Sequence, residues 1–182
     1  ALAMMEHRNI ARAYDAGSTD DGRPSFVMEY VDGLPINEYC DNARLSTVER
    51  LELLAQDCDG LQHAHHKAII HRDIKPSNVL VTVQDGIAVP KIIDFGVAKA
   101  AAQPLAEETM FTEVGQLVGT PDYMSPEQAG FHDGPVDERA DVFGLGRVLF
   151  ELITDQPAVS LTGTGPALRQ LEAQFQRAMP SA

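Results

Sequence analysis

The stretch IIHRDIKPSNVLV, residues 69–81, places a histidine, an arginine, an aspartate, a lysine and an asparagine between two apolar runs. Its ends, Ile69-Ile70 and Val79-Leu80-Val81, are typical of buried segments, whereas charged side chains are seldom buried without a partner. A chain gains from this arrangement if the apolar flanks anchor a polar loop on the core. The stretch therefore indicates a loop whose polar side chains have a chemical task.

The bulk composition is that of a globular protein with a real core. The chain has 182 residues, of which 44% are hydrophobic and 23% charged. Its net charge of −13 argues against nucleic acid or an anionic membrane surface as a non-specific partner, but it does not exclude a nucleotide. Two cysteines, Cys40 and Cys58, make no disulfide framework, and no apolar run reaches membrane-spanning length. We therefore expect a cytoplasmic domain, whose full-length parent could still be tethered to a membrane outside this segment.

The hydrophobic periodicity predicts both helices and strands. Ser46 and Glu49 form a capping-box pattern, so we predict a helix from about Ser46 to His66 with the buried stripe Leu51, Leu54, Ala55, Cys58 and Leu61. A second helix is predicted over 137–154 with the stripe Val142, Leu145, Val148, Leu149 and Leu152. Further predictions are a helix end over 1–7, strands over 10–16, 25–31, 78–83 and 89–93, a long loop over 94–126 and a last helix over 166–179.

Three motifs follow one another in a specific order. The loop from His71 to Asn78 resembles the catalytic loop of eukaryotic-like protein kinases of the bacterial serine/threonine type. Asp94-Phe95-Gly96 comes after a predicted strand, and Gly119–Glu127 resembles the family's Ala-Pro-Glu element with serine in place of alanine. Each motif alone is moderately specific, but together in this order they are very specific. By motif order the resemblance covers roughly residues 1–155.

The resemblance implies an α+β fold, the protein-kinase-like fold. The chain would hold mostly the helical C-lobe together with the last strands of the N-lobe. Residues 1–31 would be the remnant of the N-lobe, with the end of its regulatory helix, two strands and the start of the hinge. Residues 32–155 would be the C-lobe with the catalytic and activation loops, and residues 156–182 a divergent or truncated C-terminal segment.

The resemblance also assigns chemical roles. Asp73 would accept or orient the proton of the substrate hydroxyl, and Lys75 would direct a positive charge at the transferring phosphoryl group. Asn78 and Asp94 would supply hard oxygen ligands for Mg²⁺, which bridges the phosphates of ATP. Thr120 would bond the catalytic aspartate and lysine, as a threonine does in serine/threonine kinases. The implied substrates are ATP and a protein that presents serine or threonine, with Mg²⁺ as cofactor.

The segment 25–31 resembles the strand that leads into the family's hinge. Met28 would be the gatekeeper, and the backbone groups of Glu29 and Val31 would receive adenine. Leu80 matches the position that packs under the adenine ring. Without the later motifs, an ordinary edge strand would be the preferred interpretation of this segment.

Regulatory positions follow from the same resemblance. Arg72 would capture a phosphorylated activation loop through a bidentate contact with phosphate, and Thr109 and Thr112 lie where that phosphate would fall. Asp141 matches a helix carboxylate that ties down the backbone of the catalytic loop. Leu2 falls at the spine position of the regulatory helix.

The sequence departs from the family at its start. A complete kinase needs a glycine-rich loop, a strand lysine and a helix glutamate, and none of these precedes the hinge segment. Truncation upstream of Ala1 is the simplest account, so we expect little activity from the chain alone. The alternative function is a non-catalytic kinase-like binding module, a pseudokinase, but retention of all four polar groups of the reaction favours a kinase. A small-molecule phosphotransferase is disfavoured by the 120–127 element, which suits a peptide substrate.

Overall fold

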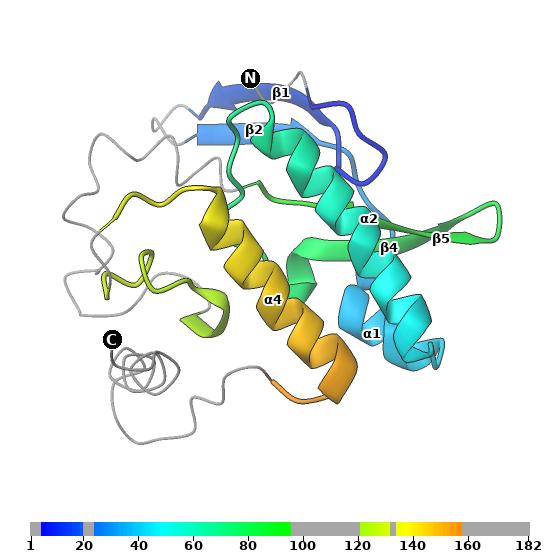
Figure 1. The fold of residues 1–182 in the computed structure, drawn as a ribbon. Helices are drawn as coiled ribbons and strands as arrows, with labels where there is room; N and C mark the ends of the chain where they lie inside the picture. The colour runs from blue at the N-terminus through cyan, green and yellow to red at the C-terminus, as the bar shows by residue number, and fades with distance from the viewer. Residues whose placement is uncertain (1–4, 20–23, 96–120, 132–133, 158–182) are drawn as a thin grey trace.

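The computed structural model describes residues 5–19, 24–95, 121–131 and 134–157, which combine short antiparallel sheets with two long helices (Figure 1). This mixture is the α+β class that the sequence predicts. In chain order the elements are β1 (Ala13–Ser18), β2 (Pro24–Met28), β3 (Leu34–Pro35), α1 (Ile36–Asn42), α2 (Thr47–His65), η2 (Pro76–Asn78), β4 (Val79–Gln84), β5 (Ile87–Ile92), η3 (Pro121–Tyr123) and α4 (Glu138–Thr154).

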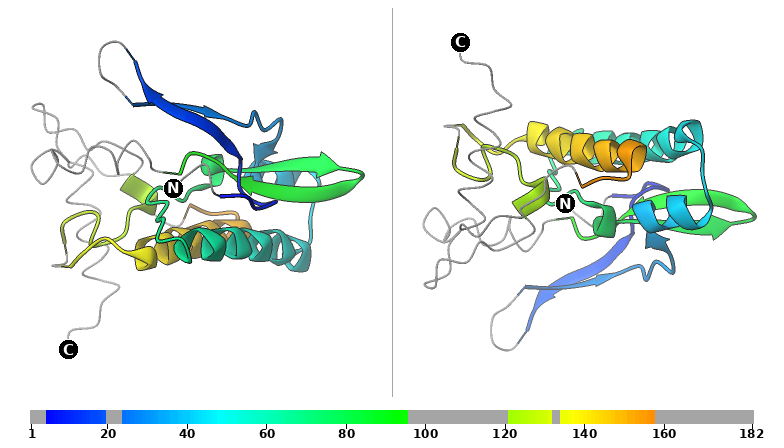
Figure 2. Two further views of the ribbon diagram at one scale, coloured as in Figure 1. Left: turned by 90° about the horizontal axis from the view of Figure 1, so that it is seen from above. Right: turned by 90° about the horizontal axis from the view of Figure 1, so that it is seen from below.

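The N-terminal hairpin lies to one side of the helices (Figure 2). Strands β1 and β2 pair antiparallel, with a register shift between Ala13 and Asp15. The chain before β1 is tied to the end of β5, because Ala11 N donates to Ile92 O and Ile92 N donates to Asn9 O, both at 2.9 Å. These two bonds fix the hairpin's starting point beside the end of the second sheet.

The second sheet has the order β3-β4-β5, and all its neighbours are antiparallel. Strands β4 and β5 confirm the predicted hairpin. Their turn residues, Asp85 and Gly86, both have positive φ angles, of 51° and 79°. Two left-handed residues match the right-handed twist of the strands, which is why Asp-Gly is favoured at this kind of turn.

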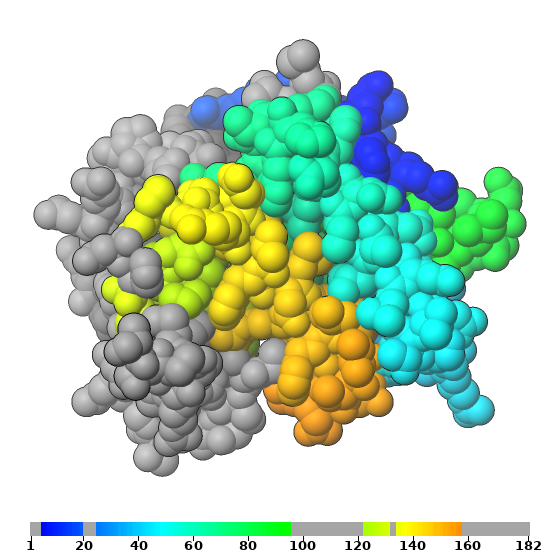
Figure 3. Space-filling view, viewed as in Figure 1, coloured from blue at the N-terminus to red at the C-terminus, as the bar shows by residue number. Residues whose placement is uncertain are grey.

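Helices α2 and α4 lie side by side and form one layer (Figure 3), with the β4–β5 hairpin in a second layer beneath them (Figure 2). The core between the layers consists of apolar side chains from every one of these elements. Its most buried members, each no more than 2% exposed, include Ile10, Ile36, Cys40, Leu61, Ala64, Ile74, Val79, Val81, Ile92, Val148 and Leu152.

Helix α2 confirms the predicted helix but not its predicted buried face. Ser46 is the N-cap, and its side chain and that of Glu49 exchange bonds with each other's backbone N–H, which is the capping box. The buried face is Leu53, Leu54, Asp57, Gly60, Leu61 and Ala64, whereas Leu51, Ala55 and Cys58 are exposed. Asp57 and Gly60 lie on the core side of the helix. The prediction, which counted apolar residues only, therefore chose a face that is rotated about the helix axis from the one that is buried.

In helix α4 the observed buried face also differs from the predicted one, but by less. Val148 and Leu152 are buried and Leu145 and Leu149 are partly buried, as predicted, but Val142 is 60% exposed. A polar and a small residue take its place on the core side, namely Asp141 and Gly144.

Two of the predicted helical segments have other outcomes. Residues 5–7 are not helical, so the predicted helix end over 1–7 is wrong for its described part. Residues 1–4 lie outside the described residues, as does the helix predicted over 166–179.

Candidate catalytic site

The loop from His71 to Asn78 is fastened to helix α4 through one carboxylate. Asp141, at 1% exposure, accepts a bond from His71 N at 2.8 Å and another from Arg72 N at 2.7 Å. His65, at the end of α2, lies with Nε2 2.7 Å from the same carboxylate. The sequence predicted the role of Asp141, but it did not predict the contact of His65, which joins the end of α2 to this anchor.

Close packing of α4 against the loop depends on a glycine. A Cβ atom at Gly144 would lie 3.0 Å from both Cβ and the backbone oxygen of Ile74. Such an approach is tighter than nine in ten real Cβ contacts, so a side chain at this position would require Ile74 to move by a few tenths of an ångström. Gly144 therefore allows the helix that carries Asp141 to reach the loop.

His71 is a fully buried imidazole with a defined proton position. Its Nε2 faces Ile93 O at 2.8 Å, and Asp73 N donates to its Nδ1 at 3.2 Å. A carbonyl can only accept, so the ring proton sits on Nε2 and Nδ1 remains the acceptor. Burial lowers the pKa of His71, in keeping with a neutral ring. The ring packs on Phe95 with 4.7 Å between centroids.

Two polar side chains of the loop meet at the carboxylate of Asp73. Lys75 Nζ lies 2.9 Å from Asp73 Oδ2. Asn78 Nδ2 donates to the same oxygen at 3.1 Å and to Asp73 O at 2.8 Å. Asn78 is only 6% exposed and is itself held by Ile93 N, which donates to Asn78 O at 2.9 Å. The structure thus brings together Asp73, Lys75 and Asn78, which the sequence assigned to one site.

Asp94 is the next residue after Ile93, whose N–H is bonded to Asn78 O. It is exposed and has a left-handed φ of 55°, while the next residue, Phe95, is buried against His71. Since the Asn78 amide nitrogen is directed at Asp73, its amide oxygen is the atom that remains to accept. An amide oxygen and an exposed carboxylate are the hard ligands that Mg²⁺ takes, so the donor set fits that ion. No cluster of three or more histidine, cysteine or acidic side chains suited to a metal occurs among the described residues.

The predicted hinge residues lie at the end of β2 and just after it. Glu29 N donates to Arg12 O at 2.8 Å, and the Glu29 carboxylate pairs with Lys91 Nζ at 2.7 Å. Met28 and Leu80 are half-buried, and Val31 is 9% exposed. The N–H of Glu29 is therefore already engaged within the chain. The ion pair of Glu29 with a buried lysine of β5 had no signal in the sequence.

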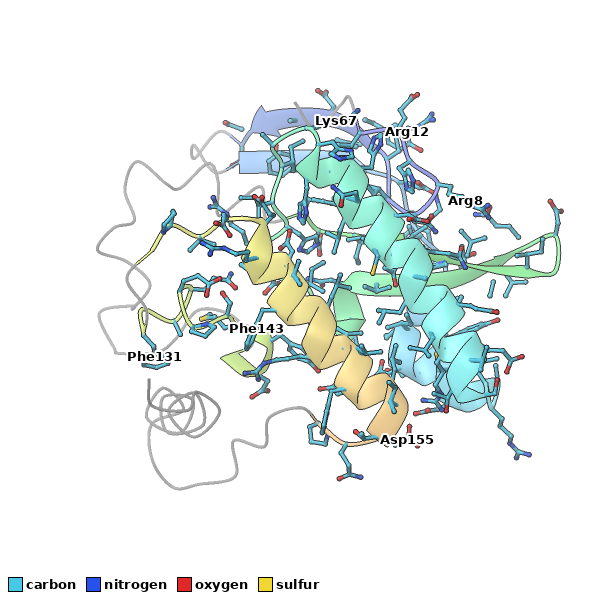
Figure 4. All side chains as sticks on the ribbon, in the orientation of Figure 1. Arg8, Arg12, Lys67, Phe131, Phe143 and Asp155 are labelled. Carbon is cyan, nitrogen blue, oxygen red and sulfur yellow. The ribbon has the colours of Figure 1, made fainter. Side chains whose placement is uncertain are left out.

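The segment 121–131 packs against α4. Tyr123 Oη donates to Glu151 at 2.8 Å, and Arg147 donates to Asp122 O. The Arg147 guanidinium lies 4.7 Å from the ring centre of Phe143, on the part of α4 that faces this segment (Figure 4). Burial lowers the pKa of Arg147 to about 10, which leaves it charged at neutral pH.

Gln128 connects this segment to the 71–78 loop. Its Nε2 donates to Arg72 O at 2.7 Å, and its Oε1 accepts from Ser125 N at 3.1 Å and from Ser125 Oγ at 3.0 Å. The sequence analysis did not single out Gln128. Four other sequence predictions, on Leu2, Thr109, Thr112 and Thr120, concern residues outside those that the structure describes.

Comparison with known proteins gives one consistent family. A family model described as the protein kinase domain matches residues 1–179. The chain is 36% identical over 168 residues to the serine/threonine-protein kinase PknB of Mycobacterium tuberculosis, covering 90% of this chain and 25% of the relative. It is 37% identical over 176 residues to the serine/threonine-protein kinase PrkC of Bacillus subtilis, covering 96% of this chain and 26% of the relative. The chain thus spans about a quarter of the length of these relatives.

Among solved structures, the kinase domain of Mycobacterium tuberculosis PknI is similar with a TM-score of 0.66 and 26% identity. That match covers 91% of this chain and 56% of the PknI chain. Because more than a quarter of the aligned residues are identical, the similarity concerns sequence as well as fold. Of the helices that the structure describes here, none has both the length and the apolar character of a membrane span.

Proposed function

We propose that this chain, which belongs to the protein kinase family, transfers the terminal phosphoryl group of ATP to serine or threonine hydroxyl groups of a protein. Membership follows from the match of the family model to residues 1–179, and the relatives are serine/threonine-protein kinases. The transfer itself, its ATP and its protein substrate are the proposal. The observation that carries it is the convergence of Lys75 and Asn78 on the carboxylate of Asp73.

Asp73 is the proposed acceptor of the hydroxyl proton. Its carboxylate is about a quarter exposed, so a substrate hydroxyl has access to it while the loop holds its direction. The bonds from Lys75 and Asn78 hold the carboxylate in one orientation, which is what a base needs before the substrate arrives. Lys75 then lies where a positive charge offsets the charge of the transferring phosphoryl group. Thr120 is proposed as a further partner of this pair.

Asn78 and Asp94 are the proposed ligands of Mg²⁺. When bound, the ion supplies charge neutralisation at the phosphates of ATP. The chain's own contribution is to present two oxygen ligands from two neighbouring segments. The bond from Ile93 N to Asn78 O supports this, because it ties the asparagine to the strand end that leads into Asp94.

Met28, Glu29, Val31 and Leu80 are the proposed contacts of the adenine ring. The engaged N–H of Glu29 supports the assignment, because it leaves the carbonyl group as the acceptor for an exocyclic amine. Met28 and Leu80 offer half-buried apolar surface of the kind that packs against a planar base.

The proposal includes a division of the chain and a means of regulation. Residues 1–31 would belong to the N-lobe, 32–155 to the C-lobe and 156–182 to a C-terminal segment. The position of the β1–β2 hairpin apart from the α2–α4 layer supports the first boundary. Arg72 would bind a phosphate on Thr109 or Thr112, since a guanidinium forms two parallel bonds with phosphate oxygens.

The test is the isosteric variant Asp73→Asn, with Asp85→Asn at the exposed β4–β5 turn as the matched control. In the complete encoded protein, labelled phosphate from the terminal position of ATP should reach a protein substrate in the control variant. The Asp73 variant should lose nearly all of this transfer while keeping the same thermal unfolding midpoint. Transfer at the control rate by Asp73→Asn would contradict the proposed role. Absence of transfer from the unsubstituted protein would contradict the proposed function.

A further inference from the structure

We propose that Gln128 is a positioning residue for Asp73, because it holds the peptide group between Arg72 and Asp73 and joins it to the segment 121–131. The inference rests on the proposed function, in which Asp73 accepts the hydroxyl proton. It adds a residue from outside the three motifs to the catalytic machinery. It also explains how two segments far apart in the sequence keep one geometry.

The carboxamide of Gln128 uses its donor and its acceptor in opposite directions. Arg72 O can only accept, so the nitrogen must face it, and the 2.7 Å contact is an N–H···O bond. On the other side, Oε1 accepts from the N–H and the hydroxyl group of Ser125, at 3.1 Å and 3.0 Å. Ser125 is fully buried. The orientation of the amide is therefore determined by three contacts.

The peptide group that Gln128 holds is fixed at both of its polar atoms. Its oxygen, on Arg72, accepts from Gln128, and its N–H, on Asp73, donates to His71 Nδ1 at 3.2 Å. Rotation of this peptide plane would break one bond or both. The direction in which Asp73 leaves the backbone follows from the plane, so the two bonds together aim its carboxylate.

The conformation of Arg72 makes such a restraint necessary. Its φ of 67° is left-handed, which costs an L-residue about 1–2 kcal/mol. The conformation is held from two sides, by Asp141 on Arg72 N at 2.7 Å and by Gln128 on Arg72 O at 2.7 Å. Without Gln128 the contact on Arg72 O is lost, and the loop gains a route to relax at the residue just before Asp73.

The other end of the bridge belongs to the segment 121–131, which holds most of the 120–127 element that suits a peptide substrate. That segment is held on α4 by the bonds from Tyr123 to Glu151 and from Arg147 to Asp122 O. Gln128 thus ties the proton acceptor and the segment 121–131 into one unit. A glutamine suits this position because one side chain offers both a donor and an acceptor. An ionised glutamate offers no donor to the Arg72 carbonyl group.

Two variants of equal length separate positioning from folding. Gln128→Met removes both kinds of bond, and Gln128→Glu keeps the acceptor for Ser125 but loses the donor to Arg72 O whenever it is ionised. Gln84→Glu, at the exposed end of β4, is the matched control. In the complete encoded protein we expect kcat of Gln128→Met to fall by about tenfold to a hundredfold, as for a small misplacement of a catalytic group, with KM for ATP unchanged.

The pH profile gives the sharper readout. A protonated glutamate can donate to Arg72 O, and a glutamate ordinarily takes up its proton near pH 4.3, so the kcat of Gln128→Glu relative to the unsubstituted protein should rise as the pH falls from 7 to 5. The ratio for Gln84→Glu should stay flat over that range. A loss in Gln128→Glu that does not depend on pH, or an unchanged kcat in Gln128→Met, would overturn the proposal.

Amide hydrogen exchange tests, independently of activity, whether Gln128 holds the backbone at Asp73 and Ser125. In Gln128→Met the amides of Asp73 and Ser125 should exchange about tenfold faster or more, while those of α2 keep their protection. Equal loosening of α2 would mean a general structural role and would refute positioning. If the unsubstituted protein transfers no phosphate, the proposed function fails, whereas unchanged exchange at Asp73 and Ser125 is what refutes the role of Gln128.

Discussion

Replacement of Asp57 should reveal a buried carboxyl group that destabilises the fold at neutral pH. Asp57 lies on the core side of α2 at 0% exposure, and neither of its oxygens has a hydrogen-bond partner among the described residues. Burial raises the pKa of this group well above its ordinary value. The folded chain therefore keeps a proton on Asp57 that the unfolded chain releases. We choose Asp57→Asn as the perturbation because it keeps the shape and removes the titration.

The direction and the size of the effect of pH on the free energy of unfolding follow from proton linkage. A group whose pKa is raised on folding contributes its full stability below the unfolded pKa, about 3.9 for aspartate, and loses it as the pH rises toward the folded pKa. Within that window the loss is about 1.4 kcal/mol per pH unit. Over two pH units inside this window, the free energy of unfolding of Asp57→Asn should therefore gain about 2.7 kcal/mol relative to that of the unsubstituted protein. Cys40, the nearby thiol, stays neutral throughout, because burial raises its pKa to about 11.

The assay is urea unfolding of both proteins at several pH values between 4 and 7. The difference in the free energy of unfolding should be close to zero at pH 4 and should grow with pH. All other titrating groups are common to both proteins and cancel in the difference. Asp59→Asn, exposed on the same helix, is the matched control and should show no such trend. A difference that stays flat between pH 4 and 7 would show that Asp57 is solvated or paired, and would refute the reasoning.

Three further predictions use other single changes. Ala68 has a left-handed φ of 56°, so Ala68→Gly should raise the free energy of unfolding by about 0.5–1 kcal/mol; a lower value in urea unfolding would contradict this. Gly144→Ala should lower it by about 1–3 kcal/mol, because the new Cβ would meet Ile74 at 3.0 Å. Gly146→Ala, in open space on the same helix, should not lower it, and equal losses in both variants would refute the packing argument. Asp94→Asn should abolish Mg²⁺-dependent phosphate transfer and leave the unfolding midpoint unchanged, so transfer at the normal rate would exclude Asp94 as a ligand.

The sequence could predict those parts of the site whose chemistry is written in consecutive residues. The loop with Asp73, Lys75 and Asn78 was predictable because its residues are close in the chain, and the turn of the β4–β5 hairpin was predictable because Asp-Gly favours one turn type. The buried face of α2 was not predictable from hydrophobicity, because Asp57 breaks the apolar pattern on the side that faces the core. Gln128 carried no signal, because its partner Arg72 O is a backbone atom that any residue would provide.

The backbone geometry of the catalytic loop is a property of the tertiary fold and not of the loop's own sequence. Arg72 adopts a left-handed conformation that an isolated peptide would leave, since it costs about 1–2 kcal/mol. The bonds that hold it come from α4 and from the segment 121–131, through Asp141 and Gln128. Both elements must therefore be in place before the carboxylate of Asp73 can take its direction. Since α4 also carries the segment 121–131, through Arg147 and Glu151, displacement of this one helix would release both restraints together.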